Sequence, residues 1–299
     1  MKYCIDKLYE AVGVKGHVCL GLDTSVEYVP GRERSKALND AQAVLGFNKA
    51  LIDATYDVVA CFKVQIAYYE EMGIEGLKVY SETLKYIKSK SALVIADIKR
   101  GDIADTALRY VKAHYSGDFS ADFVTISPYM GMDSIEPWLN EARNLGKGAF
   151  VLMRTSNSGM KDFQYLTLSD DFSGMGKKQR VYHIVGNKMT ELAKNNMGSY
   201  GYGIFGVVVG CTEREEASEL RQFYPDLFFL IPGYGAQGGG AQDVAILLKD
   251  GNGGVVNASR SIITAWQKEA NAENADNVFA ANAARSAAIK MRDEIKNAL

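Results

Sequence analysis

The sequence predicts an α/β fold, a closed (β/α)8 TIM barrel formed by a single domain over residues 1–299. Two observations predict it: eight short apolar runs recur along the chain, and amphipathic stretches lie between them. Each run is nearly continuous in apolar residues before a polar end, as expected for parallel strands buried on both faces. Eight alternations of strand and helix favour a barrel over the alternative, an open doubly wound sheet.

The eight predicted strands are residues 17–23, 60–65, 92–99, 122–128, 148–155, 205–211, 227–234 and 253–260. Helical periodicity between them predicts helices that include residues 40–57, 70–89, 102–115 and 180–195.

Three segments lie outside this repeat. Residues 155–179 are polar and rich in glycine, which predicts an active-site lid after the fifth strand. Residues 1–16 form an amphipathic pattern, and residues 271–299 are rich in alanine with charges spaced around them. We therefore expect extra N- and C-terminal helices outside the barrel.

Composition excludes several classes of partner. With 34 basic and 36 acidic side chains the net charge is −2, so no basic excess predicts nucleic-acid or membrane binding. No segment approaches the roughly 20 apolar residues of a membrane span, and the N-terminus lacks the apolar stretch of a signal peptide. Four cysteines without a CxxC pair indicate buried, reduced thiols. We expect a cytoplasmic protein.

The strongest candidate catalytic residues lie near the end of the third predicted strand. Alternation along a strand puts Asp97 and Lys99 on one face, and Lys63 reaches the same depth from a neighbouring strand. A structural salt bridge is the alternative, but buried ion pairs rarely add net stability. Three charges that interrupt apolar runs favour a site. Asp105, by contrast, is expected only to stabilise a helix N-terminus.

The chemistry of such a cluster is specific. Lysines beside carboxylates in a partly desolvated pocket stay protonated. A protonated lysine is a poor Schiff-base nucleophile but a good proton donor to a carbanion. A carboxylate fixed in the pocket would repel a substrate carboxylate, and loss of CO2 relieves that repulsion. The cluster therefore favours decarboxylation followed by protonation.

A second candidate site follows the seventh and eighth strands, where barrels of this kind bind phosphate. Five glycines lie between residues 233 and 240, more than a tight turn needs, and they allow backbone N–H groups to approach phosphate oxygens. Arg260 offers a bidentate clamp. Residues 233–238 also match GxGxxG, which alone would predict a dinucleotide-binding oxidoreductase. The following strand lacks the acidic residue that binds ribose in such folds.

Metal and nucleophile patterns are poor. The three histidines, His17, His114 and His183, form no HxH or HExxH pattern, and no GxSxG motif occurs. No metal site is predicted.

Taken together, D-x-K-x-x-D-I-x-x-T at residues 97–106, PGYGAQGG at 232–239 and SRSI at 259–262 resemble the orotidine 5′-phosphate decarboxylase family, in its longer-chain (type 2) form. The resemblance extends from Asp23 to Arg260. It implies decarboxylation of orotidine 5′-phosphate to uridine 5′-monophosphate (UMP), the last step of de novo UMP synthesis, without metal or organic cofactor. A sugar-phosphate decarboxylase or aldolase of the same superfamily is the alternative. A non-catalytic barrel is disfavoured, because buried charges are costly to keep.

The resemblance also implies roles for the charged residues. Lys99 would protonate C6 of the pyrimidine, Asp97 would lie against the departing carboxylate, and Lys63 would link Asp97 to the ribose. Asp102 would complete an alternating Lys–Asp–Lys–Asp array. Asp102, Ile103 and Thr106 would enter the site of a neighbouring subunit, so the active form would be a homodimer.

Other residues are implied as substrate contacts. They are Asp23 for the ribose, Ser156 or alternatively Ser158 for a pyrimidine edge, Gln237 and Arg260 for the phosphate, and Ser259 and Pro232 beside them.

Overall fold

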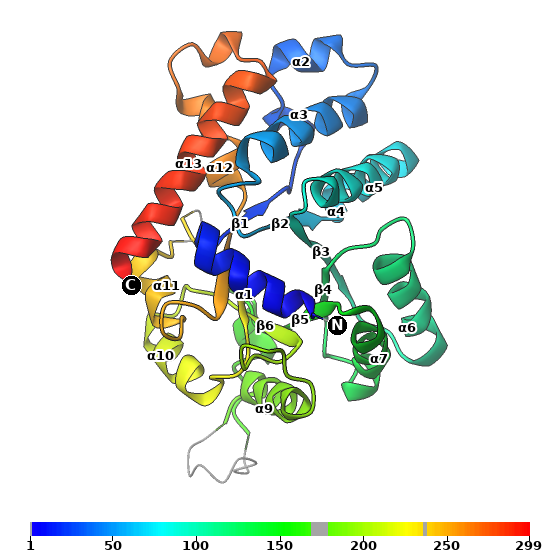
Figure 1. The fold of residues 1–299 in the computed structure, drawn as a ribbon, viewed down its shortest axis with the longest axis vertical. Coiled ribbons are helices and arrows are strands. Elements are labelled where there is room, and N and C mark those ends of the chain that lie inside the picture. The colour runs from blue at the N-terminus through cyan, green and yellow to red at the C-terminus, as the bar shows by residue number, and fades with distance from the viewer. Residues whose placement is uncertain (1, 169–178, 236–237) are drawn as a thin grey trace.

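The computed structural model describes residues 2–168, 179–235 and 238–299 (Figure 1). Its strands are all parallel and pair in the order of the chain, and β1 closes the sheet by pairing with β8, where Val18 lies opposite Val256. The predicted (β/α)8 barrel is therefore confirmed, and the open sheet is excluded. The strands are β1 Val18–Gly21, β2 Cys61–Gln65, β3 Leu93–Arg100, β4 Phe123–Ile126, β5 Gly148–Arg154, β6 Phe205–Val209, β7 Phe229–Ile231 and β8 Gly254–Ala258.

Helices surround the barrel, as Figure 1 shows. The α-helices are α1 Cys4–Lys15, α2 Gly31–Lys36, α3 Asp40–Thr55, α4 Ala67–Glu70, α5 Gly73–Ser89, α6 Ala104–Val111, α7 Glu136–Leu145, α8 Met160–Phe163, α9 Val181–Lys194, α10 Arg214–Phe223, α11 Ala241–Ile246, α12 Arg260–Ile263 and α13 Asn277–Ala298. Shorter turns are η1 Val26–Tyr28, η2 Lys112–Ser116, η3 Met132–Ser134, η4 Ala265–Lys268 and η5 Ala272–Asn274.

The strands are shorter than the apolar runs that predict them, with one exception. β7 ends at Ile231 because Pro232 has no backbone N–H to continue the ladder. β3 instead extends one residue beyond its predicted end, to Arg100, through an irregular segment described below.

Two predicted helices are interrupted. The helix predicted at 70–89 is preceded by a separate turn, α4, and restarts at Gly73, whose φ of +66° suits glycine better than other residues. The helix predicted at 102–115 begins at Ala104 and changes to a π-helical turn at Lys112. Asp102 therefore precedes the helix, whereas Asp105 lies in its first turn as expected.

The predicted terminal helices are present. α13 packs along α3, and its N-cap residue Asp276 accepts a hydrogen bond from the backbone N–H of Phe279 at 2.8 Å. α1 contacts the segments that precede several strands: Cys4 N–H donates to the Gly146 carbonyl at 2.7 Å, and Asp6 accepts from Ser199 N–H at 2.6 Å. α1 therefore covers the amino-terminal end of the barrel and crosses the front of Figure 1.

Among the described residues, no helix is both long and apolar enough to cross a membrane.

Candidate active site

Neighbouring strands bring four charged side chains to the carboxyl-terminal end of the barrel. Lys63 in β2 lies opposite Gly21 of β1, and Asp97 in β3 lies opposite Gln65 of β2. Asp23 lies two residues after the end of β1, and Lys99 lies near the end of β3. This is the end at which barrel enzymes build their sites.

The four side chains form a continuous chain of ion pairs. Lys63 Nζ lies 3.1 Å from Asp23 Oδ1 and 2.8 Å from Asp97 Oδ2, and Lys99 Nζ lies 2.6 Å from Asp97 Oδ1. Lys63 and Asp97 are buried, whereas 48% of the Lys99 side chain is exposed. Both Lys99 and Asp97 line the cavity described below, but the Lys99 side chain is far more exposed than its carboxylate partner.

Opposite charges dominate the protonation of the buried pair. Burial disfavours the ammonium form of Lys63, but Asp23 and Asp97 outweigh burial and raise the pKa of Lys63 above its usual value. Burial likewise favours the neutral acid at Asp97, but Lys63 and Lys99 hold the pKa of Asp97 well below its usual range. Both side chains are therefore charged at neutral pH.

The backbone around Lys99 is irregular. Ala96 pairs with Val124 and Arg100 pairs with Ile126, so residues 97–99 bulge opposite the single residue Thr125. Lys99 has a φ of +44°, in the left-handed region that costs a non-glycine residue roughly 1–2 kcal/mol. Asp97 and Lys99 meet as the sequence predicts, but through a bulge instead of regular alternation.

A cavity of about 290 Å³ opens beside this charged chain. Of the predicted residues, Ser156 and Pro232 line it, and Ser158 does not. It is also lined by polar residues that were not among the predicted site residues: Gln65, Thr125, Thr155, Asn157 and Asn257. Gln65 could have been found from strand alternation, because it lies two residues after Lys63. Apolar walls come from Leu152, Val208 and Leu230.

A smaller cavity of about 120 Å³ adjoins the first and shares Asp23, Pro232 and Asn257 with it. Ser259 and Arg260 line this second cavity, and Ser259 Oγ donates to Asp23 Oδ2 at 2.8 Å. A Cβ atom on Gly21 would lie only 1.9 Å from Ser259 Oγ, so a larger residue there would displace the hydroxyl group that bonds Asp23. Gln237 lies outside the described residues.

The remaining predicted residues lie apart from both cavities of their own chain. The Asp102 carboxylate accepts a hydrogen bond from Ile103 N–H at 2.9 Å, and among the described residues it forms no ion pair. Ile103 and Thr106 are exposed. Within one subunit the row of ion pairs therefore begins at Lys99 and ends at the Asp23 carboxylate.

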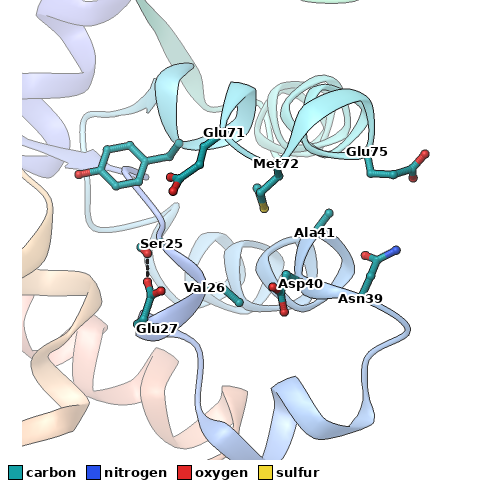
Figure 2. A pocket seen from close by; sticks show the side chains of 10 residues that line it. Ser25, Val26, Glu27, Asn39, Asp40, Ala41, Glu71, Met72 and Glu75 are labelled. Carbon is teal, nitrogen blue, oxygen red and sulfur yellow. Dashed lines mark hydrogen bonds between the residues drawn. The ribbon is translucent and has the colours of Figure 1, made fainter.

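A still larger cavity, of about 470 Å³, lies between η1, α3 and the α4–α5 segment (Figure 2). Its charged lining residues are all acidic: Glu27, Asp40, Glu71 and Glu75. Figure 2 shows the Ser25 hydroxyl donating a hydrogen bond to the Glu27 carboxylate at one edge of this cavity. Such a lining repels anions, so the lysine-containing cavity is the better candidate for a phosphorylated substrate.

Fold and site together define a (β/α)8-barrel enzyme with a buried lysine–aspartate site at the carboxyl ends of its strands. Residues 16–275 match the model of the family described as orotidine 5′-phosphate decarboxylase / HUMPS. The chain belongs to this family.

Relatives agree over nearly the whole chain. The chain is 54% identical over 294 residues to an orotidine 5′-phosphate decarboxylase of Clostridium perfringens (strain 13 / Type A), covering 98% of each chain. It is 50% identical over 295 residues to the Clostridium tetani enzyme of the same name, covering 99% of this chain and 98% of the relative. The structure of Leishmania donovani OMP decarboxylase superposes with a TM-score of 0.73 at 30% identity, covering 98% of each chain.

Proposed function

We propose that the protein decarboxylates orotidine 5′-phosphate to UMP and CO2, the last step of de novo UMP synthesis. The reaction takes place in the cavity lined by Lys63, Asp97 and Lys99. One observation carries the proposal: the buried Asp97 carboxylate is held in its charged form between two lysines, and one ammonium, that of Lys99, faces the cavity. Membership of the decarboxylase family supports the choice of substrate.

In this proposal each charged group has one task. Asp97 lies against the substrate carboxylate, and the repulsion between them is relieved when CO2 leaves. The electron pair of the broken bond stays on C6, and Lys99 Nζ donates a proton to it. Lys63 keeps Asp97 charged and joins it to Asp23, which binds the ribose. Ser156 contacts the pyrimidine.

Binding energy far from the reacting carbon supports this step. Arg260 and Ser259 hold the phosphate in the smaller cavity, which Pro232 and Gly233 also line. Gln237 is a further phosphate contact that the family resemblance implies. Because that cavity adjoins the charged chain through Asp23, phosphate and ribose contacts can hold the carboxylate against Asp97.

The test is incubation of the purified protein with orotidine 5′-phosphate in EDTA, followed by measurement of UMP and CO2. We expect full conversion that is insensitive to the chelator. Absence of UMP, together with turnover of a sugar phosphate that stops in EDTA, would contradict the proposed substrate.

We further propose that the active form is a homodimer in which Asp102, Ile103 and Thr106 enter the partner's site. Two observations support this: these residues lie outside their own cavity, and they border an exposed apolar surface. That surface comprises Ile103, Leu108, Tyr129 and Met130, and Tyr129 is 86% exposed. α6 packs against η3, which brings the Tyr129–Met130 turn beside α6.

We also propose that the chain is one domain and that residues 155–179 act as a lid. Residues 169–178 lie outside the described residues. The residues on either side of them, Leu168 and Gln179, are joined by a backbone hydrogen bond. Leu168 N–H donates to the Gln179 carbonyl at 2.8 Å, and Arg180 pairs with Glu216 while lying 4.1 Å above the Tyr165 ring.

A substitution that loosens this junction tests the lid. Glu216→Gln should lower kcat/KM by about 10-fold, the effect of roughly 1.4 kcal/mol. The control, Glu191→Gln, removes an exposed pair with Lys188 on α9 and should change nothing. Equal kcat/KM for both variants would exclude this role.

The cytoplasm is the compartment we propose, because all four cysteines are free and buried.

A further inference from the structure

We propose that the hydroxyl group of Thr125 is the positioning group of this site, and that it fixes both the Asp97 carboxylate and the backbone of Lys99. The inference rests on the proposed function, because it concerns the array that performs the decarboxylation. Thr125 lies in β4 and is buried.

The bulge in β3 creates the need for such a group. Residues 97–99 lie opposite Thr125 alone, so the regular β3–β4 pairing is interrupted at Ile98 and Lys99. A buried N–H group without a partner is costly. Thr125 Oγ1 accepts hydrogen bonds from both Ile98 N–H and Lys99 N–H, each at 3.0 Å.

The same hydroxyl also orients the carboxylate. Thr125 Oγ1 donates its proton to Asp97 Oδ1 at 2.8 Å, and this is the oxygen to which Lys99 Nζ donates at 2.6 Å. A hydroxyl group has one donor and two acceptor positions, so Thr125 uses its full capacity here. Its donor position can only face Asp97 because both acceptor positions are taken by backbone N–H groups.

One atom therefore couples two features that the chemistry needs. It stabilises the left-handed conformation of Lys99, which sets where the side chain leaves the backbone. It also fixes the rotation of Asp97, together with Gln65, which donates to Asp97 Oδ2 at 3.0 Å. Loss of the hydroxyl should shift Lys99 Nζ relative to Asp97, while the phosphate end of the site stays unchanged.

The experiment compares three variants with the wild-type protein. Thr125→Val keeps the shape and removes the hydroxyl, whereas Thr125→Ser keeps the hydroxyl and removes the methyl group. Thr83→Val is the matched control, because Thr83 is also buried and its hydroxyl accepts from Asn48 at 3.4 Å, away from the cavity. We measure kcat and KM for orotidine 5′-phosphate, Kd for UMP and thermal unfolding.

We expect Thr125→Val to lower kcat by about 100-fold, the effect of a displacement near 1 Å at a reacting group, with little change in Kd for UMP. Thr125→Ser should recover most of kcat. Thr83→Val should keep the wild-type kcat even if its unfolding temperature falls. Thr125→Ala gives the same comparison should the valine variant not fold.

Three results would overturn the inference: wild-type kcat without the hydroxyl, a serine variant as slow as valine, or a loss of UMP affinity that matches the loss of kcat. These results are distinct from failure of the proposed function, in which the wild-type protein itself produces no UMP. That failure would remove the basis of both proposals.

Discussion

At the scale of single residues, the Asp97 carboxylate accounts for much of the site. It accepts hydrogen bonds from Lys63, Gln65, Lys99 and Thr125. A buried carboxylate is stable only when its partners are complete, and removing one partner of a buried pair costs about 3–5 kcal/mol. These contacts keep Asp97 ionised.

Replacement of Lys99 by alanine tests the proton donor. Asp97 keeps its bonds to Lys63, Gln65 and Thr125, so we expect Lys99→Ala to fold and to bind UMP. Turnover should fall by at least about 10²-fold, because positioned proton transfer contributes about that much or more. Steady-state kinetics and calorimetric UMP titration measure the two effects. Lys78→Ala, which removes an exposed pair with Glu75, is the control. Retention of most activity would exclude Lys99 as the donor.

Sequence reasoning found the charges but missed part of what orients them. Lys63, Asp97 and Lys99 interrupt apolar runs, and such interruptions are visible in one dimension. Thr125 is an ordinary strand residue, and its role depends on a bulge in the neighbouring strand. Bulges arise from pairing between distant segments, so no local pattern predicts this one.

At the scale of elements, the periodicity of the sequence predicted which strands and helices exist better than it predicted where they begin and end. The strands lie in the predicted runs because parallel strands buried on both faces must be apolar. The helix predicted at 102–115 instead changes to a π-helical turn, η2, which places His114 in the interior. There its ring lies 5.8 Å from Phe119.

His114 should make the stability depend on pH. Burial, aided by the charge of Arg100, lowers its pKa to about 4. Between about pH 6.5 and 4 the unfolded chain therefore binds a proton that the folded protein does not, so stability falls as pH falls. The expected loss is about 3 kcal/mol. His114→Gln should remove this dependence, so urea unfolding at several pH values should show the wild-type protein losing about 3 kcal/mol relative to the variant between about pH 6.5 and 4. Parallel curves would contradict the assignment.

At the scale of the whole molecule, the barrel and its charged site could be predicted from one chain, but the completeness of the site could not. Asp102 belongs to the motif with Asp97 and Lys99, yet among the described residues of its own chain its carboxylate accepts a hydrogen bond only from the backbone N–H of Ile103. A single sequence contains no information on which subunit receives a side chain. The exposed apolar surface around α6 is the structural reason for proposing a partner.

Mixing of inactive variants tests the shared site. If Asp102 acts across the interface, a dimer of one Lys99→Ala and one Asp102→Ala subunit contains one intact site, so co-expression should restore activity. A mixture of Lys99→Ala with Asp97→Asn is the control. Lys99 and Asp97 both belong to the part of a site that its own barrel supplies, so each site of the mixed dimer lacks one of them and no intact site can form. Absence of recovery in the first mixture, with dimers present, would contradict the proposal.

The position of α1 has a consequence for the order of events in a catalytic cycle. This helix closes one end of the barrel, where it forms hydrogen bonds to the segments before β5 and β6. The nucleotide and CO2 would then both pass through the opposite, carboxyl-terminal end of the barrel. In the proposed binding mode the substrate carboxylate lies against the buried Asp97, so the CO2 formed there would leave either past the bound nucleotide or after the nucleotide dissociates.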